Sequence, residues 1–372
     1  MLKLKALQAE HGDCFVLEYG TTADPKYILI DGGPKYIYDN HLKDELRKIR
    51  DGGGKLRLVI LSHVDNDHVI GLLDMIAELR QQRANGEKET ITVDSLWHNS
   101  FSQTIGSGTD IESRLRTLLT TAATAPQTIA VAGMSLDGIS QGHQLRLAAS
   151  AHGIPINHES PSGFISVEEM PTRNVFDNLS LLVVGPTKEN IEILQKEWLE
   201  WLEAQERGVE TADPFFASMS DDSFKNLSSI MVLAEAEGKK ALLTGDGRGD
   251  HLIQGLGKAG LLDADNSLHV NVLKVPHHGS DRNVTKDFFS TITADTYIIS
   301  GNGKHGNPDL ATLIWMVEAA KEQGRAIKII LTNDTLSTRK LKDEYPPNDY
   351  GYTLEQIKSG DHSVIVEIAQ PS

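Results

Sequence analysis

The chain has 372 residues, of which 39% are hydrophobic and 24% charged, and its formal net charge is −16 at pH 7. Such a length allows one large domain or two. The negative charge argues against broad nonspecific adhesion to nucleic acid, which usually needs a basic surface, but it leaves open a local basic groove or a metal site that engages phosphates. Cys14 is the single cysteine, which excludes an intrachain disulfide, and we expect it to be a small buried residue.

The N-terminal residues 1–7 alternate like a strand and lack the apolar core of a signal peptide. No stretch of the sequence reaches the roughly 18 apolar residues that a membrane span needs. We therefore expect a cytoplasmic protein without a membrane partner.

The first 95 residues read as strands followed by helices. Strands are predicted at residues 2–8, 15–19, 27–30 and 58–61, with another near 91–97. A helix is predicted near 40–50, where the three glycines 52–54 end it, and apolar residues recur at helical spacing after His68.

The composition changes between about residues 98 and 180. Ser, Thr, Gly and Ala dominate residues 100–135, and helical periodicity occurs near 111–122 and 140–152. We interpret this region as an insertion that caps or shapes a site within a single domain spanning 1–372. A strand at 179–184 and a charged helix at 189–205 follow, and Trp198 and Trp201 in that helix are predicted to be packing residues.

The second half repeats the strand-rich style. Strands are predicted at 229–235, 240–243, 270–275, 296–299, 328–331 and 363–368, with a helix near 310–323. Residues of the kind that bind metals follow several of these strands. The pattern predicts an α/β fold in which two mixed sheets form a sandwich flanked by helices.

A cluster of four polar side chains lies on the turn after the strand at 58–61. His63, Asp65, Asp67 and His68 fall within six residues, and the helical spacing begins directly after them. Burying two imidazoles and two carboxylates without partners is costly, and metal coordination by nitrogen and oxygen ligands removes that cost. We therefore predict a metal site here; the alternative is a solvated polar loop.

Two further clusters follow later strands. Asp246 comes after the strand at 240–243 and is suited to bridge two metal ions about 3.5–4 Å apart. His277 and His278 follow the strand at 270–275. Because neighbours in an extended chain point opposite ways, we expect only one of the pair to bind metal and favour His277, leaving the other to contact substrate or to pack.

These residues together resemble the metallo-β-lactamase superfamily, whose signature is His-x-His-x-Asp-His followed by a distant Asp and a distant His. The resemblance implies a four-layer αββα sandwich, two divalent metal ions (Zn or Mn) and metal-dependent hydrolysis. The match departs at Asp65, where the commonest family pattern has histidine. A carboxylate there hardens the site and favours manganese or magnesium-like ions over zinc.

Five motifs in order are also similar to the soluble hydrolase domain of competence-type DNA uptake proteins, over roughly residues 1–95 and 179–331. They lie at residues 12–14, 29–33, 226–232, 242–246 and 275–280. In that subgroup an Asn-x-x-Ser strand, matched by Asn226 and Ser229, stands where other members supply another histidine ligand. The loop 300–308 resembles the subgroup's Gly-His-Pro loop, with His305 at its histidine. The membrane channel of those proteins is absent, so transport is not implied.

The leading hypothesis is a metal-dependent phosphodiesterase or nuclease that uses a metal-activated water, with the substrate class taken from this resemblance. Asp67 would orient the water or bind a metal. His305 would stabilise the developing oxyanion or protonate the leaving oxygen, unless it is only an exposed loop residue. Asp13 and Asp31 are expected to support the ligands or to shape turns.

Two alternatives stay open. The same centre could hydrolyse an ester, lactone or thioester, because one fold hosts many chemistries. The chain could also be a non-catalytic metal-bound module that recruits a protein partner through the helix of Trp198 and Trp201 and the insertion. Homo-oligomers are equally open.

Nucleic acid as the phosphodiester substrate would need basic residues near the site. The candidates are Lys274, Arg282, Lys286 and Lys304 beside the site loops, and Arg339, Lys340 and Lys342 in the tail. The tail residues are more typical of a solvated charge run.

Overall fold

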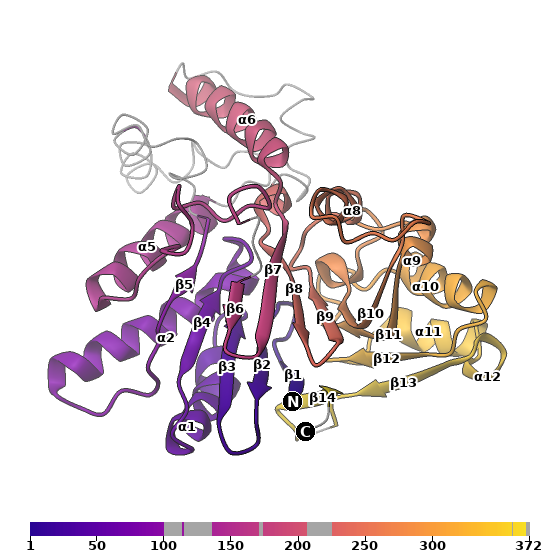
Figure 1. Ribbon diagram of the computed structural model, residues 1–372, viewed down its shortest axis with the longest axis horizontal. Helices are drawn as coiled ribbons and strands as arrows, with labels where there is room; N and C mark the ends of the chain where they lie inside the picture. The colour runs from indigo at the N-terminus through magenta and orange to yellow at the C-terminus, as the bar shows by residue number, and fades with distance from the viewer. Residues whose placement is uncertain (100–113, 115–135, 171–173, 207–224, 359, 370–372) are drawn as a thin grey trace.

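The computed structural model describes residues 1–99, 114, 136–170, 174–206, 225–358 and 360–369. Its strands form two mixed sheets (Figure 1). The six-stranded sheet has the order β14-β1-β2-β3-β4-β5, and the eight-stranded sheet has the order β13-β12-β11-β10-β9-β8-β7-β6. The first contains β1 (Leu2–Leu7), β2 (Phe15–Gly20), β3 (Pro25–Ile30), β4 (Leu56–Ile60), β5 (Leu96–Trp97) and β14 (Ser363–Ala369). The second contains β6 (Asn174–Phe176), β7 (Leu179–Gly185), β8 (Met231–Ala236), β9 (Lys239–Leu243), β10 (Leu268–Lys274), β11 (Ile292–Ile299), β12 (Ile327–Leu331) and β13 (Tyr352–Gln356).

Helices cover the outer face of each sheet (Figure 1). The six-stranded sheet is covered by α1 (Lys43–Asp51), which continues the π-helical turn Tyr38–Leu42, and by α2 (Asn66–Asn85) and α5 (Leu136–His152). The eight-stranded sheet is covered by α8 (Gly249–Lys258), α9 (Lys286–Thr291), α10 (Leu310–Glu322) and α11 (Leu336–Glu344). The other helices in the described part of the chain are α6 (Lys188–Glu206) and α12 (Pro347–Tyr350), with the short turns η2 (Lys225–Ser228) and η3 (Pro276–Gly279).

The hydrophobic core has three layers of packing. The middle one joins the two sheets, with Leu17 and Ile60 on one side and Leu243 and Ile298 on the other. The outer two lie between each sheet and its own helices. The fold is therefore α/β with helix, sheet, sheet and helix layers, which confirms the predicted four-layer sandwich.

Several element bounds differ from those expected. The strand expected near 91–97 is reduced to Leu96–Trp97, because only these residues continue the ladder with β4. The strand β13 was not predicted, since its side chains are mostly exposed and give no apolar run. Of the region of helical periodicity near 111–122, all but residue 114 lies outside the described residues. None of the described helices combines the length and apolar character that a membrane crossing requires.

The insertion near 98–180 is described only in part, and the single-domain organisation stays a prediction. Its helix α5 packs with α2, through Leu145 and Ala149, in the layer that covers the six-stranded sheet. Among the described residues, none of the insertion lines the pocket reported below.

The strand directions bring the predicted site residues to one edge. β3 and β4 run parallel in one sheet, and β9, β10 and β11 run parallel in the other. The loops after these strands carry Asp31, His63, Asp246, His278 and Ser300. Side chains that follow the carboxyl ends of parallel strands share one edge of a sheet, which is where ligands bind in open α/β folds.

Candidate metal centre

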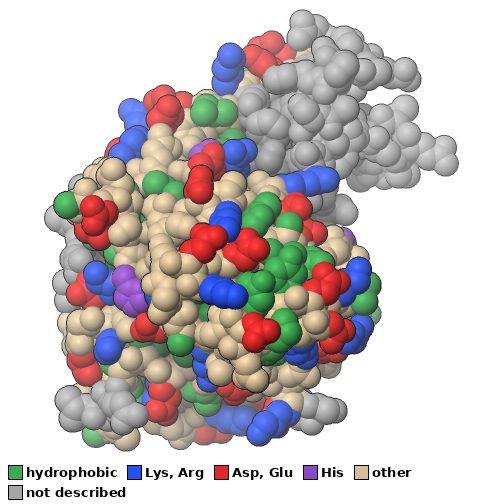
Figure 2. All heavy atoms as spheres, turned by 90° about the vertical axis from the view of Figure 1, so that its right-hand side faces the viewer, with side chains coloured by type: hydrophobic (Ala, Val, Ile, Leu, Met, Phe, Trp, Pro, Cys, Tyr) green, Lys and Arg blue, Asp and Glu red, His purple; other side chains and the backbone are tan. Residues whose placement is uncertain are grey.

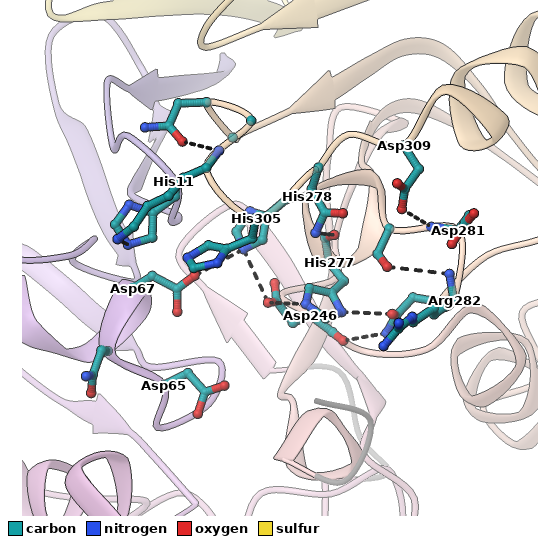
Figure 3. A pocket seen from close by; sticks show the side chains of 18 of the residues that line it. His11, Asp65, Asp67, Asp246, His277, His278, Asp281, Arg282, His305 and Asp309 are labelled. Carbon is teal, nitrogen blue, oxygen red and sulfur yellow. Dashed lines mark hydrogen bonds and ion pairs between the residues drawn. The ribbon is translucent and has the colours of Figure 1, made fainter. Parts of the chain in front are cut away.

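The carboxylate of Asp246 lies at the centre of the site. Its Oδ2 is 3.7 Å from Nε2 of His63, 3.4 Å from Nε2 of His68, 3.6 Å from Nε2 of His277 and 3.3 Å from Nε2 of His278. The two former histidines come from the β4–α2 turn and the two latter from the η3 turn after β10. The structure therefore brings together the residues that the sequence placed in three separate clusters (Figure 3).

The β4–α2 turn is held by a close approach between the loop after β3 and the start of helix α2. The backbone N–H groups of His68 and Val69 donate to the carbonyl oxygen of Asp65, which begins helix α2. A Cβ added at Gly71 would lie 1.9 Å from the carbonyl oxygen of Gly32, so only glycine fits there. The loop between β3 and the π-helical turn Tyr38–Leu42 can thus pack directly on the first turns of α2, next to His68.

The buried imidazole nitrogens of the site indicate whether metal ions fit there. Among the described residues, Nε2 of His63, His68 and His278 are buried and have no hydrogen-bond partner. Buried polar atoms without partners are rare and usually indicate a missing ion or water. Two groups, His63–His68–Asp246 and Asp67–His68–His278, place their ligand atoms within 4.8 Å of one another. These residues fit divalent cations bound by nitrogen and oxygen.

The Nδ1 atoms of His68 and His278 contact oxygen atoms on the side away from Asp246. Nδ1 of His68 lies 2.9 Å from Oδ2 of Asp31, and Asp31 also accepts hydrogen bonds from the backbone and the hydroxyl of Ser62. Nδ1 of His278 donates to the carbonyl oxygen of Ser300 at 2.9 Å. Such contacts fix the ring orientation and direct Nε2 toward a metal. Asp31 thus lies in the supporting position that was expected of it.

The paired histidines do not follow an extended chain. His277 and His278 have φ values of 46° and 53° inside the η3 turn, so both rings face Asp246 instead of pointing opposite ways. The expectation of an extended conformation is wrong. His278 belongs to the groups that could hold a metal, whereas His277 does not; Nδ1 of His277 contacts Asn283 at 2.8 Å and Asn226 at 3.2 Å.

The two aspartates of the first cluster differ in position. Oδ2 of Asp65 is 3.7 Å from Nε2 of His63. Asp67 reaches Nε2 of His278 at 3.5 Å and Nε2 of His68 at 3.8 Å. Both aspartates line the pocket in front of the histidines.

Burial and charge shift the pKa values of the site in opposite directions. Burial, together with the neighbouring His68, lowers the pKa of His63 to about 3. Burial would also lower the pKa of His68, but the carboxylates of Asp246, Asp67 and Asp31 outweigh it and raise that pKa well above its ordinary value. The centre therefore attracts positive charge, which protons supply when metal ions do not.

A pocket of about 890 Å³ opens in front of the centre. Its lining combines ligand-type, cationic, imidazole and amide side chains with the acidic residues Asp281 and Asp309. These include Asp65, Asp67, Asp246, His277, His278, Arg248, Arg282, Lys304, His11, His305 and Asn283. The predicted catalytic residues Asp67 and His305 thus share one pocket, as Figure 3 shows.

His11 is a pocket residue that the sequence analysis missed. Its ring lies 5.3 Å from that of His305, and its Nε2 is 3.3 Å from Nζ of Lys304. A Cβ on the next residue, Gly12, would lie 1.9 Å from the carbonyl oxygen of Asp67, so the loop is packed against the metal-binding turn. The signal was the position of His11 directly before the Gly-Asp-Cys motif at residues 12–14.

The basic residues divide into two groups. Arg282 and Lys304 line the pocket, as does Arg248, which was not predicted. The prediction that Lys274 lies in a substrate groove is wrong, because its side chain is buried against Asp13. The others lie outside the pocket lining: Lys286 pairs with Glu318 and Glu322, and Arg339, Lys340 and Lys342 lie on α11.

Comparison with known proteins gives a partial match. Residues 8–107 match the family model of the Metallo-beta-lactamase superfamily, a segment that contains His63, Asp65, Asp67 and His68. No curated protein sequence matches the chain. The chain is similar to a crystal structure described as a "Putative metal-dependent hydrolase" from Parabacteroides distasonis, with 9% identity, a TM-score of 0.38 and coverage of 88% of this chain and 93% of that one.

The narrower resemblance to competence-type DNA uptake proteins has no counterpart in these matches and stays a prediction. Residues 8–107 are thus similar to the metallo-β-lactamase superfamily, and the described chain has the two-sheet α/β fold of that superfamily around a group of His and Asp residues that can hold divalent metal ions.

Proposed function

We propose that this chain is a metal-dependent hydrolase that cleaves phosphodiesters at a centre of two divalent ions, Zn or Mn. The superfamily match supports the hydrolase class. One observation carries the substrate class: the pocket that holds the ligand-type side chains is also lined by three cationic residues, Arg248, Arg282 and Lys304.

The ligands form two groups that share His68: His63 and Asp246 complete one, and Asp67 and His278 complete the other. Asp65 adds a carboxylate beside His63. Divalent ions held there would lower the pKa of a water molecule and neutralise charge on the attacked group.

The remaining side chains of the pocket handle the proton and the substrate charge. Asp67 faces the pocket between His68 and His278, with its side chain 21% exposed, where it can orient a water molecule or bind an ion. His11, Lys304 and His305 stand together on the adjoining wall. They can donate hydrogen bonds to a phosphoryl oxygen or a proton to the leaving oxygen.

The distribution of charge favours an anionic substrate at this pocket. The chain carries a net charge of −16, yet Arg248, Arg282 and Lys304 all line this pocket, beside Asp281 and Asp309. Divalent ions held by the ligands would add further positive charge there. On the face covered by the helices of the eight-stranded sheet, basic side chains are scattered among acidic ones (Figure 2). A phosphodiester would therefore find its cationic partners at the pocket and not across that face.

The test is hydrolysis of bis(p-nitrophenyl) phosphate with added manganese or zinc. We expect metal-dependent turnover that Asp246→Asn reduces by at least about a hundredfold, because the central ligand is lost. Asp343→Asn makes the same chemical change at an exposed position of α11 and should leave turnover unchanged. DNA, RNA and cyclic nucleotides would then be compared as substrates.

Two results would contradict the proposal. Turnover of p-nitrophenyl acetate or a lactone without turnover of the phosphodiester would indicate an ester or lactone hydrolase on the same centre. Bound metal without hydrolysis of either class would indicate a non-catalytic module.

A further inference from the structure

Lys274 places a buried positive charge behind the metal centre. Its side chain is 1% exposed at the end of β10. Nζ lies 2.5 Å from Oδ2 of Asp13 and 3.5 Å from Oδ1 of Asp246, and it donates to the carbonyl oxygen of Gly245 at 2.7 Å. A buried ammonium group needs such partners, because its desolvation is costly. It lies outside the pocket lining, so substrate does not reach it.

The two aspartates divide their oxygens between Lys274 and the histidines. Asp13 turns Oδ2 to Lys274 and Oδ1 to Nδ1 of His278, at 3.4 Å. Asp246 turns Oδ1 to Lys274 and Oδ2 to the Nε2 atoms of the four site histidines. The ammonium group therefore fixes which carboxylate oxygens face the centre.

Asp13 is also close enough to act as a ligand. Asp13, Asp246 and His278 form a buried group whose ligand atoms lie within 4.8 Å of one another. It has three residues, as many as each of the two groups assigned to metal above. The ammonium group of Lys274 contacts both carboxylates of this group. A divalent cation there would meet a fixed positive charge a few ångströms away.

We propose that Lys274 is a built-in cation that stands in for a further metal ion: it keeps Asp13 out of the ligand set, presents Asp246 through Oδ2 alone, and sets the metal affinity of the centre. It is a positioning residue, since it touches neither substrate nor reacting atoms. The inference rests on the metal centre of the proposed function but not on the substrate.

The test is a double-variant cycle read out by metal binding. The free Mn²⁺ or Zn²⁺ concentration at half-occupancy is measured by chelator competition, and the bound ions per chain by elemental analysis. We expect Lys274→Met to bind metal at least about tenfold more tightly, Asp13→Asn at least about tenfold more weakly, and the double variant within about threefold of the wild type, because the two opposite charges compensate.

A purely structural role predicts a different pattern. If Lys274 only stabilises the fold, both single variants and the double variant bind metal more weakly than the wild type, which would overturn the proposal. The control is Lys286→Met, which removes a lysine paired with Glu318 and Glu322 on the outer helices. It should leave the free metal concentration at half-occupancy unchanged.

Lys274→Met leaves Asp13 buried without its partner and can unfold the chain, which circular dichroism would show. The cycle stays decisive in that case, because Asp13→Asn must still weaken metal binding and the double variant must restore it. No substrate enters the measurement, so a chain that is inactive on phosphodiesters can still give this cycle.

Discussion

Nδ1 of His68 lies 2.9 Å from Oδ2 of Asp31, and both side chains are completely buried. Asp31 is fixed in turn by Ser62, whose backbone N–H donates to Oδ1 and whose hydroxyl donates to Oδ2. The pair joins the end of β3 to the first turn of α2. In the neutral ring that binds a metal, it holds the proton on Nδ1 and leaves the lone pair of Nε2 for the metal.

Removing this support should weaken the metal centre without removing a ligand. We expect Asp31→Ala to lower metal affinity by about 10–100-fold, as the loss of a carboxylate behind a metal-binding histidine usually does. Chelator competition measures the effect, and Asp24→Ala, at an exposed position of the β2–β3 turn, serves as the control. Unchanged affinity in a folded Asp31→Ala variant would show that the metal centre does not depend on Asp31 to hold His68.

Metal binding should release protons near neutral pH. Although burial opposes it, the surrounding carboxylates raise the pKa of His68 and of His278 well above the ordinary value, so protons compete with a metal ion for both rings. A metal binds the neutral imidazole, so metal affinity should rise with pH, and protons should leave these rings on binding.

Calorimetry in buffers of different ionisation enthalpy gives the number of protons released. His278→Gln should reduce that number. Release of no protons would contradict the raised pKa values or the assignment of these two histidines as ligands.

Substrates with different leaving groups can distinguish the role of the pocket histidines from that of the metal ligands. If His11 or His305 protonates the leaving oxygen, His11→Gln or His305→Gln should slow a methyl phosphodiester by about 10²–10⁴-fold. The same variants should hardly slow bis(p-nitrophenyl) phosphate, whose leaving group needs no proton. Bound metal should stay at the wild-type level. Equal losses on both substrates would assign the residue to binding instead of proton transfer.

Two helical glycines offer a matched test of the loop contact beside the centre. A Cβ at Gly71 would lie 1.9 Å from the carbonyl oxygen of Gly32, whereas a Cβ at Gly257 in α8 would meet only Leu262, at 3.7 Å. We expect Gly71→Ala to destabilise the fold by about 1–3 kcal/mol through overpacking. Gly257→Ala should be neutral or stabilising by up to about 1 kcal/mol, because alanine favours helix.

Thermal unfolding by circular dichroism compares these two variants. Equal midpoints would mean that the Gly32 loop can move away from α2 at little cost. Metal affinity should fall together with stability in Gly71→Ala, since that loop also carries Asp31.

Much of the site could be predicted because its residues follow strands. His63 and Asp246 each come after a short apolar run, and the carboxyl ends of parallel strands meet at one edge whatever the loops do. The order of strands and helices likewise indicated two covered sheets. These are local patterns that the sequence displays directly.

The remaining features depend on tertiary contacts. The orientation of His277 and His278 follows from positive φ values in a turn that also contacts the backbone of Gly245, which no local pattern reveals. Lys274 reads as a basic residue beside a motif, and only its contact with Asp13, distant in sequence, shows that it is buried. His11 gained its place through the packing of Gly12 on Asp67.

The position of Asp246 has a mechanical consequence. His63 and His68 belong to the six-stranded sheet and its helix, while Asp246 and His278 belong to the eight-stranded sheet. An ion held between them would act as a crosslink at the open edge of the sandwich, and binding at about a hundred times its Kd would add roughly 2.7 kcal/mol to the stability of the fold. Chelation would then loosen the seam between the sheets first, so hydrogen exchange should rise at the ends of β4 and β10 before it rises in the core.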